Sequence, residues 1–287
     1  MRAGIDQYAT RVEGEPEIRD RMDPCVWGLP STPELEGFAE RGYLQRYGVI
    51  SSATVEACLA EIERVQEDPR LEGDERIIRE EHKTAVRSIF DIDLLSTVVR
   101  EAISESGAEE LAREILGSEV YVHQSRLNYK PGFQGGAFYW HSDFETWHAE
   151  DGMPIPRAVS ASIALTRNEA YNGPLMIIPG SQRLFVQCAG KTPVNYHRRS
   201  LVTTTPQIGV PSQDVVTELW NSFGIDMLTG PVGSMTMFDS NVMHASGGNI
   251  TPIPRANIFV VFNSVENRLG QPFAAGATRP PYLARRG

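Results

Sequence analysis

The chain has 287 residues, of which 41% are hydrophobic and 22% are charged, and its formal net charge is −10. This length supports one large hydrophobic core, and β-rich domains of this size often remain single. An acidic chain without a basic stripe cannot neutralise phosphates, which argues against nucleic acid or an anionic membrane as its partner.

Cysteine usage and the lack of long apolar segments indicate the compartment. Cys25, Cys58 and Cys188 are far apart and form no Cys-x-x-Cys pair, so neither a disulfide framework nor a zinc ribbon is predicted. The first residues lack the apolar segment of a signal peptide, and no apolar run is long enough to span a membrane. We therefore expect a cytoplasmic protein. The absence of a P-loop and of a Gly-x-Gly-x-x-Gly motif disfavours phosphate-binding and hydride-transfer enzymes.

The first part of the chain is predicted to be an arm followed by helices. Residues 1–30 are polar and contain several prolines, which indicates an extended arm with little regular structure. Residues 31–117 are predicted to form mainly helical support, in which Ser31 caps a first helix that stops near Gly42. Periodic apolar residues predict further helices. They lie at about 53–66, 92–105 and 107–115, with a short strand at 47–50 and an exposed charged segment at 67–84.

From residue 119 onward the pattern becomes that of β-strands. Residues 120–129 are rich in β-branched and aromatic side chains and alternate in part between apolar and polar. Further strand candidates lie at 137–143, 158–166, 174–179, 183–187, 233–239 and 256–263. Glycine, proline and asparagine clusters separate them, as expected for antiparallel strands joined by turns.

The order of these elements favours one fold class. Helices followed by antiparallel strands suit a β-rich α+β fold, a double-stranded β-helix (jelly roll, cupin-like) core at 118–265 braced by the N-terminal helices. Residues 188–232 form a long connection inside this core, which is typical of a lid, a binding loop or a partner contact. Residues 266–287 are a basic C-terminal loop or tail. We expect a single domain over 1–287.

A short aromatic stretch at 138–152 contains the candidate metal ligands His141 and Asp143. If the stretch is a strand, side chains two residues apart point to the same face, so one imidazole and one carboxylate reach a common ion. His244 follows another predicted strand about a hundred residues later. Two histidines and one carboxylate are the facial triad of non-haem Fe(II) oxygenases. The His-x-Asp pattern alone is weak evidence, because most histidines in such a pattern are surface or hydrogen-bonded core residues.

A fixed cation follows the third candidate ligand. Arg255 lies eleven residues after His244, across a turn rich in glycine and proline and at the start of another predicted strand. A guanidinium in this position suits bidentate binding of the far carboxylate of 2-oxoglutarate. A surface ion pair is the alternative role of this arginine.

Four stretches of the chain resemble the ectoine hydroxylases. They are residues 124–133, 138–154, 172–181 and 248–255. These enzymes form part of the phytanoyl-CoA-dioxygenase-like branch of the Fe(II)/2-oxoglutarate oxygenases. The resemblance runs from about residue 115 to 283 and is weaker before that. It implies a jelly-roll core, a homodimer, and conversion of ectoine, 2-oxoglutarate and O2 to 5-hydroxyectoine, succinate and CO2.

The resemblance also implies three sets of site residues. The Fe(II) ligands are His141, Asp143 and His244. The 2-oxoglutarate contacts are Arg255, Ser246 and Asn128. The substrate contacts are Gln124, Thr146, Trp147, Ser162, Phe238, Phe259 and Arg279. Among the remaining residues of the metal stretch, His148 is predicted to be structural and Glu145 to support the ligands.

Aromatic faces suit the ectoine ring, because that ring is a delocalised amidinium cation, and Trp147, Phe238 and Phe259 are the candidates. Core packing is the alternative role of each. Two other functions stay open at this stage. One is the same oxygenase chemistry on another small cyclic or amino-acid-like molecule. The other is a jelly-roll protein that binds metal or solute without turnover.

Overall fold

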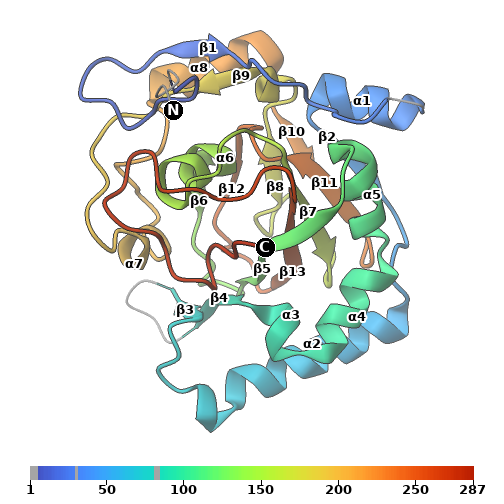
Figure 1. Ribbon diagram of the computed structural model, residues 1–287. Helices are drawn as coiled ribbons and strands as arrows, with labels where there is room; N and C mark the ends of the chain where they lie inside the picture. The colour runs from blue at the N-terminus through green and yellow to red at the C-terminus, as the bar shows by residue number, and fades with distance from the viewer. Residues whose placement is uncertain (1–5, 30–31, 81–84) are drawn as a thin grey trace.

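Two facing antiparallel sheets form the body of the protein, and helices cover the outside of the larger one (Figure 1). The computed structural model describes residues 6–29, 32–80 and 85–287. This arrangement of layers agrees with the predicted double-stranded β-helix.

The larger sheet has seven strands and runs through the middle of the molecule. Their order is β2 (Tyr43–Arg46), β11 (Met235–Asp239), β7 (Ala158–Ala164), β13 (Arg255–Ser264), β5 (Val120–Lys130), β4 (Val86–Phe90) and β3 (Ile77–Arg79). The long central pair, β13 and β5, stays in register from Arg255 opposite Lys130 to Val261 opposite Gln124, and a bulge follows.

The smaller sheet faces the larger one and carries two of the candidate ligands at its edge. Its order is β10 (Asp226–Leu228), β8 (Leu175–Ile177), β12 (His244–Ser246) and β6 (Phe138–His141). A separate two-stranded sheet pairs β1 (Ile18–Asp20) with β9 (Leu184–Val186). The arm at the N-terminus is therefore fixed to the body by main-chain hydrogen bonds.

Helices lie on the outer face of the larger sheet and in the long connection. The first group comprises α1 (Pro33–Arg41), α2 (Ser52–Glu67), α3 (Ile92–Leu95), α4 (Thr97–Glu105) and α5 (Ala108–Leu116). The segments α6 (Asp143–Thr146) and η2 (Trp147–Asp151) follow β6, and α7 (His197–Ser200) and α8 (Gln213–Phe223) lie in the long connection. Short 3-10 turns are η1 (Pro69–Leu71) and η3 (Ser181–Arg183).

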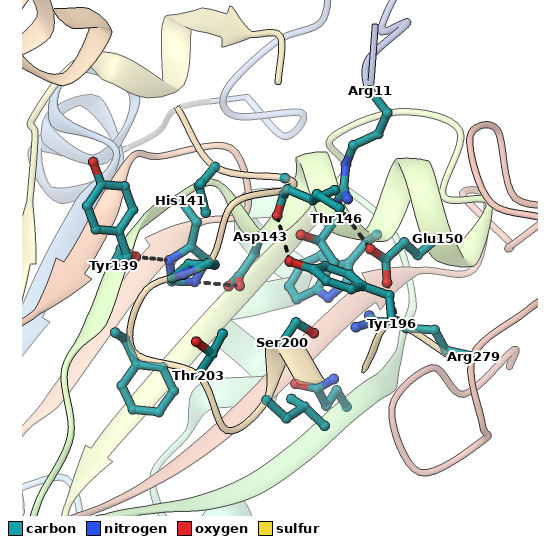
Figure 2. A pocket seen from close by; sticks show the side chains of 18 of the residues that line it. Arg11, Tyr139, His141, Asp143, Thr146, Glu150, Tyr196, Ser200, Thr203 and Arg279 are labelled. Atoms are coloured by element: carbon teal, nitrogen blue, oxygen red, sulfur yellow. Dashed lines mark hydrogen bonds and ion pairs between the residues drawn. The ribbon is translucent and has the colours of Figure 1, made fainter. Parts of the chain in front are cut away.

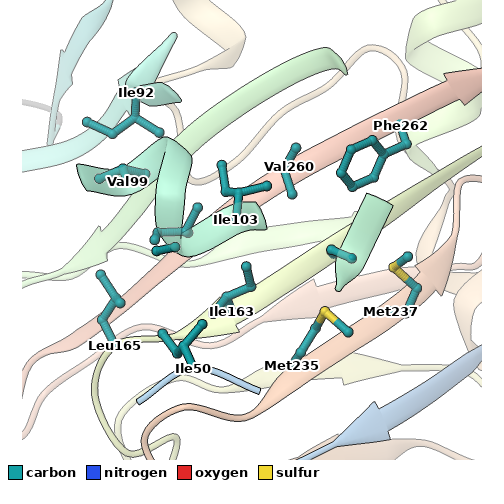
Figure 3. Close-up of a cluster of buried hydrophobic side chains, with 14 of the residues drawn as sticks. Ile50, Ile92, Val99, Ile103, Ile163, Leu165, Met235, Met237, Val260 and Phe262 are labelled. Carbon is teal, nitrogen blue, oxygen red and sulfur yellow. The ribbon is translucent and has the colours of Figure 1, made fainter. Parts of the chain in front are cut away.

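The main core fills the space between the larger sheet and its helices. Figure 3 shows Val99 and Ile103 of α4 facing Ile163 of β7 and Val260 and Phe262 of β13. These side chains are buried, and those on β7 and β13 alternate along their strands with side chains that point toward the smaller sheet. One face of the sheet thereby supports the helices and the other remains for the site.

Several predicted helices are confirmed, and the capping residue of the first helix differs from the prediction. The helix that starts the support ends at Gly42, which has φ +79 in the left-handed region. Thr32 caps it by accepting a hydrogen bond from Leu35 N, while the predicted cap, Ser31, lies outside the described residues. The predicted helix 92–105 is interrupted at Ser96, whose side chain accepts from Val99 N and starts a second helix.

Three strands in the first part of the chain differ from prediction. The strand expected at 47–50 is wrong, because Gly48 takes φ +65 and turns the chain just after β2. β3 and β4 were not predicted and form a hairpin at the end of the larger sheet. Their charged side chains, such as Arg79 and Arg87, conceal the strand pattern, and charge is common at sheet edges. The long connection also contains α7, α8 and β10, which were not predicted.

Within the described residues, no helix is both long and apolar enough to cross a membrane.

Truncating the core is expected to destabilise the fold strongly. Ile163 is fully buried in β7 against the helices, so Ile163→Ala should lower the free energy of unfolding by roughly 2–5 kcal/mol. Leu94 is 61% exposed, and Leu94→Ala should change it by less than about 0.5 kcal/mol. Urea unfolding followed by circular dichroism measures both. Equal losses in the two variants would contradict this assignment of the core.

Candidate metal and 2-oxoglutarate site

The three candidate ligands come together at the open edge of the smaller sheet. His141 is the last residue of β6, and His244, the first residue of β12, is paired directly opposite it. Asp143 is the first residue of α6, because Ser142 ends the strand and caps the helical turn by accepting from Glu145 N. One ligand atom from each of His141, Asp143 and His244 lies within 4.8 Å of the others.

The prediction that one strand carries both His141 and Asp143 is wrong. Their side chains converge across a strand-to-helix junction instead. The two residues are still adjacent in space, because the turn at Ser142 is tight and its side chain donates to Asn241 beside the second histidine. The two-residue spacing correctly predicted that the two side chains lie close together, but a strand-to-helix junction brings them there and not one extended strand.

The orientation of both imidazoles fits metal binding. His141 Nδ1 lies 2.7 Å from Tyr139 O, and His244 Nδ1 lies 3.1 Å from Val242 O, so each Nδ1 carries the proton. The Nε2 atoms then face Asp143 as lone-pair donors, at 3.6 Å from Oδ1 for His141 and 3.9 Å from Oδ2 for His244. Two imidazoles and one carboxylate with an open side suit Fe(II).

Electrostatics keep this donor set in the protonation states that a metal requires. Burial alone would raise the pKa of Asp143, but His244, His141 and Arg126 outweigh it and the pKa is lowered. Burial lowers the pKa of His244 to about 4, and His141 acts in the same direction. The carboxylate is therefore ionised and His244 is neutral at neutral pH.

Arg255 is a buried cation without an acidic partner. It starts β13, is 1% exposed, and donates to Gly173 O and, at 3.3 Å, to Asn257 Oδ1. Among the described residues no carboxylate lies within ion-pair distance of Arg255. Burial, with a contribution from Arg126, lowers the pKa of Arg255 to about 10. A buried guanidinium in this state is favourable only when an anion completes it.

The other two predicted contacts of 2-oxoglutarate lie on strands of the two facing sheets. Asn128 of β5 is paired opposite Asn257 of β13, two residues after Arg255, and its buried Oδ1 has no hydrogen-bond partner within the described residues. Ser246 is buried on β12, two residues after His244. A buried polar atom without a partner is rare in a native fold and indicates a bound group.

A pocket opens beside the triad, and four predicted substrate contacts line it. Gln124, Thr146, Trp147 and Arg279 are among its walls, together with the metal-binding side of His141 and Asp143 (Figure 2). Side chains of the long connection close the opposite side. They include Tyr196, Ser200, Leu201, Thr203 and Ile208. The predicted lid is thus in contact with the cavity of the site.

The other three predicted substrate contacts lie deeper, around the second histidine. Phe238 packs against His244 with ring centroids 5.0 Å apart, and Phe259 meets Phe238 edge to face at 6.4 Å. Ser162 Oγ accepts a hydrogen bond of 2.9 Å from Asn257 Nδ2. These residues do not line the open pocket, and Ser162 supports the Asn257 that holds Arg255.

The model of the phytanoyl-CoA dioxygenase family matches residues 38–257 of this chain. The chain belongs to the phytanoyl-CoA dioxygenase family. The ectoine dioxygenase of Nocardia farcinica is 52% identical over 283 residues, which covers 98% of this chain and 94% of that relative.

Solved structures agree with the family and with the predicted fold. The crystal structure of EctD from S. alaskensis with 2-oxoglutarate and 5-hydroxyectoine has a TM-score of 0.87 to this chain at 41% identity. The match covers 98% of this chain and 95% of the EctD chain. EctD from S. alaskensis with bound Fe gives a TM-score of 0.85, with the same identity and coverage. The predicted family, jelly-roll class and dependence on Fe(II) and 2-oxoglutarate are confirmed.

Two strand residues outside the predicted set, Arg126 and Asn257, lie beside the candidate site residues. Arg126 lies between Gln124 and Asn128 on β5, lines the pocket, and sits 5.3 Å over the ring of Phe259. Asn257 lies between Arg255 and Phe259 on β13 and touches the site through its amide. Alternation along the strands could have identified both, because Arg126 and Asn257 each lie two residues from two predicted site residues and therefore point to the same face.

The N-terminal arm also reaches the pocket, which no local pattern indicated, and the C-terminal tail reaches it with the predicted Arg279. Arg11 of the N-terminal arm lines the cavity and holds Glu145, so this carboxylate pairs with the arm and not with the ligands. Gln124 Nε2 donates to Leu283 O of the tail at 2.7 Å. His148 has a structural position, with Nδ1 2.8 Å from Met153 O and its ring stacked on Phe273.

Removal of one ligand is expected to abolish tight Fe(II) binding by this phytanoyl-CoA dioxygenase family member. Asp143→Ala and His244→Ala should each weaken binding by at least ~100-fold, because fewer protein donors remain and open coordination positions go to water. Anaerobic equilibrium dialysis against Fe(II) measures the change. His197→Gln removes a buried histidine outside the triad and should bind iron as the unaltered protein does. Wild-type binding by His244→Ala would rule out the triad.

Proposed function

We propose that this protein is an Fe(II)/2-oxoglutarate-dependent dioxygenase that hydroxylates ectoine to 5-hydroxyectoine, with release of succinate and CO2. The observation that carries this conclusion is the likeness, over nearly the whole chain, to EctD from S. alaskensis with 2-oxoglutarate and 5-hydroxyectoine. The triad and the unpaired Arg255 support it independently, because a protein that only binds a solute needs neither.

His141, Asp143 and His244 are proposed to hold the iron. Fe(II), when bound there, supplies the coupling of 2-oxoglutarate decarboxylation by O2 to hydroxylation of the substrate. The protein contributes placement: Tyr139 O and Val242 O fix the imidazoles through Nδ1, so that both Nε2 atoms face the same point.

Arg255, Asn128 and Ser246 are proposed to bind 2-oxoglutarate. Arg255 has donors in a rigid fork that match a carboxylate, and Asn257 and Gly173 O hold its orientation. Arg126 also projects from β5 toward this side of the cavity, and its charge favours an anionic cosubstrate there. Positive charge is thus concentrated beside the iron ligands, where a dianion has to bind.

The substrate is proposed to lie in the pocket between η2 and the long connection. Trp147 presents an aromatic face to a delocalised cation, with Gln124 and Thr146 as polar neighbours and Arg279 for the carboxylate. Phe238 and Phe259, beneath the pocket, and Ser162, through Asn257, are proposed to complete the substrate site from below. The lid residues exclude water from this space.

The organisation around the site is also part of the proposal. We propose that residues 1–287 act as one domain, since the arm and the tail both contact the jelly-roll core. The family resemblance supports a homodimer, and the three free cysteines fit a reducing cytoplasm. Its partner is then a small molecule, without nucleic acid or a membrane.

Turnover should be coupled to ectoine. With Fe(II), 2-oxoglutarate and air, the protein is expected to release succinate in a one-to-one ratio with a product 16 mass units heavier than ectoine, because one oxygen atom enters each molecule. Ion chromatography and mass spectrometry measure the two products, with proline and no substrate as controls. Succinate without hydroxyectoine would keep the oxygenase and reject ectoine. Iron-loaded protein that forms neither product would favour the binding protein.

Arg255→Ala should raise the 2-oxoglutarate requirement steeply. Loss of a bidentate charge-assisted pair is expected to increase KM for 2-oxoglutarate by about 100-fold or more, and Arg255→Lys should recover only part of the loss. Arg167→Ala is the matched control, because that arginine is 65% exposed and pairs with Glu169 on the surface. Succinate formation against 2-oxoglutarate concentration measures KM. An unchanged KM in Arg255→Ala would contradict this role.

A further inference from the structure

Charged side chains from three parts of the chain meet beside one wall of the pocket, and three of them, Arg11, Glu150 and Arg279, line it. Arg11 comes from the N-terminal arm, Arg279 from the C-terminal tail, and Glu145, Glu150 and Asp151 from α6 and η2. Figure 2 shows Glu150 between Arg11 and Arg279, on the same side of the pocket as Thr146.

Each guanidinium in this group is matched to one carboxylate. Arg11 donates to both oxygens of Glu145, at 2.7 Å from Nε and 2.9 Å from Nη2. Arg279 donates to both oxygens of Asp151, at 2.7 Å from Nε and 2.6 Å from Nη2. His123 Nε2 also lies 3.6 Å from Asp151 Oδ2. Bidentate pairing is the strongest arginine–carboxylate arrangement, and it engages the Nε and Nη2 atoms of both guanidinium groups.

Glu150 is the third carboxylate of the group, and among the described residues no cation other than these two arginines lies within ion-pair distance of it. Its nearest cationic atoms are Arg11 Nη2 at 3.2 Å and Arg279 Nε at 3.9 Å, which the other two carboxylates already engage. Glu150 is 3% exposed and lines the pocket. Burial, with Asp151 and Glu145 in the same direction, raises its pKa although both arginines oppose the shift. Two guanidinium groups against three carboxylates leave one buried negative charge.

We propose that Glu150 binds the cationic half of the substrate and thereby selects for it. This inference rests on the proposed function, in which the substrate is ectoine, a cyclic zwitterion with one amidinium and one carboxylate. The N–H groups of the amidinium donate to Glu150 and supply the missing positive charge, while the substrate carboxylate lies toward Arg279. A charged partner of this kind rejects neutral analogues, because they leave Glu150 buried without a match.

The position of Glu150 in the helical segment supports a direct contact. Asp143, Thr146, Trp147 and Glu150 are spaced as i, i+3, i+4 and i+7 along α6 and η2, and all four line the same pocket. A substrate that stacks on Trp147 next to the metal ligand therefore has Glu150 within the same wall. Glu145, equally buried, is absent from the pocket lining as described and contacts Thr10 and Arg11 instead.

The test compares binding of ectoine with binding of pyroglutamate, a neutral lactam that keeps the carboxylate but lacks the cation. Calorimetry on the anaerobic enzyme loaded with Fe(II) and 2-oxoglutarate gives the Kd of each. Glu150→Gln keeps the shape and removes the charge. It is expected to weaken ectoine by roughly 10- to 100-fold and to leave pyroglutamate unchanged or slightly tighter. Glu150→Asp keeps the charge at a shorter reach and should give an intermediate loss.

Two controls separate a contact from general disruption. The visible charge-transfer absorption of the Fe(II)–2-oxoglutarate complex should persist in each variant and reports that the metal site is assembled. Glu34→Gln removes a carboxylate that pairs with Arg46 and does not line the pocket, so it should keep the wild-type preference for ectoine over pyroglutamate.

Three results overturn the inference. If Glu150→Gln binds ectoine with wild-type affinity, the inference about Glu150 is wrong and the proposed function stands. Equal weakening of both ligands makes Glu150 a structural residue. Should the unaltered enzyme itself bind no ectoine, the proposed function fails first and this assignment of Glu150 fails with it.

Discussion

The site depends on the antiparallel pairing of β6 with β12. Because His244 lies directly opposite His141 in this pair, two ligands from distant parts of the sequence are fixed by main-chain hydrogen bonds at the edge of a sheet. Ser142 then ends β6 and turns Asp143 back toward both histidines. A metal site requires its donors to be held before the ion arrives, and backbone pairing provides more rigidity than flexible loops. A shift of one residue in this register would point one imidazole away from the other.

The larger sheet performs two tasks because its strands alternate. On β13, Ile258, Val260 and Phe262 pack under the helices, while Arg255 and Asn257 face the opposite sheet. The apolar layer stabilises the fold through burial. This stabilisation offsets the free-energy cost of burying polar groups on the other face. Among the described residues, Asn128 Oδ1 is left on that face without a hydrogen-bond donor and the Arg255 guanidinium without an acid matched to it, as the proposed binding of 2-oxoglutarate requires. Stability and function are thereby assigned to different faces of the same strands.

The two ends of the chain finish the pocket. The arm is held by β1 and by a buried ion pair of 2.8 Å between Arg21 and Asp239, which lies at the end of β11 before the His244 loop. The tail is held by Arg285, which pairs with Asp91 and Asp93. These ion pairs dock the end of the tail on the body of the protein. The substrate wall is therefore assembled from segments that only the folded chain brings together.

Local chemistry and strand periodicity determined much of this protein from the sequence alone. The helix stop at Gly42, most strands of the core, the family and the residues of the triad follow from glycine conformation, alternation and a long specific stretch around His141. The tertiary structure decided what depends on contacts between distant segments. These include the partner of Glu145, the approach of Arg11 and Leu283, and the helical form of 143–151 that turns Glu150 into the pocket. Local periodicity cannot report them, because pairing of buried charges is chosen by the whole fold and overrides the extended conformation that the aromatic residues favour.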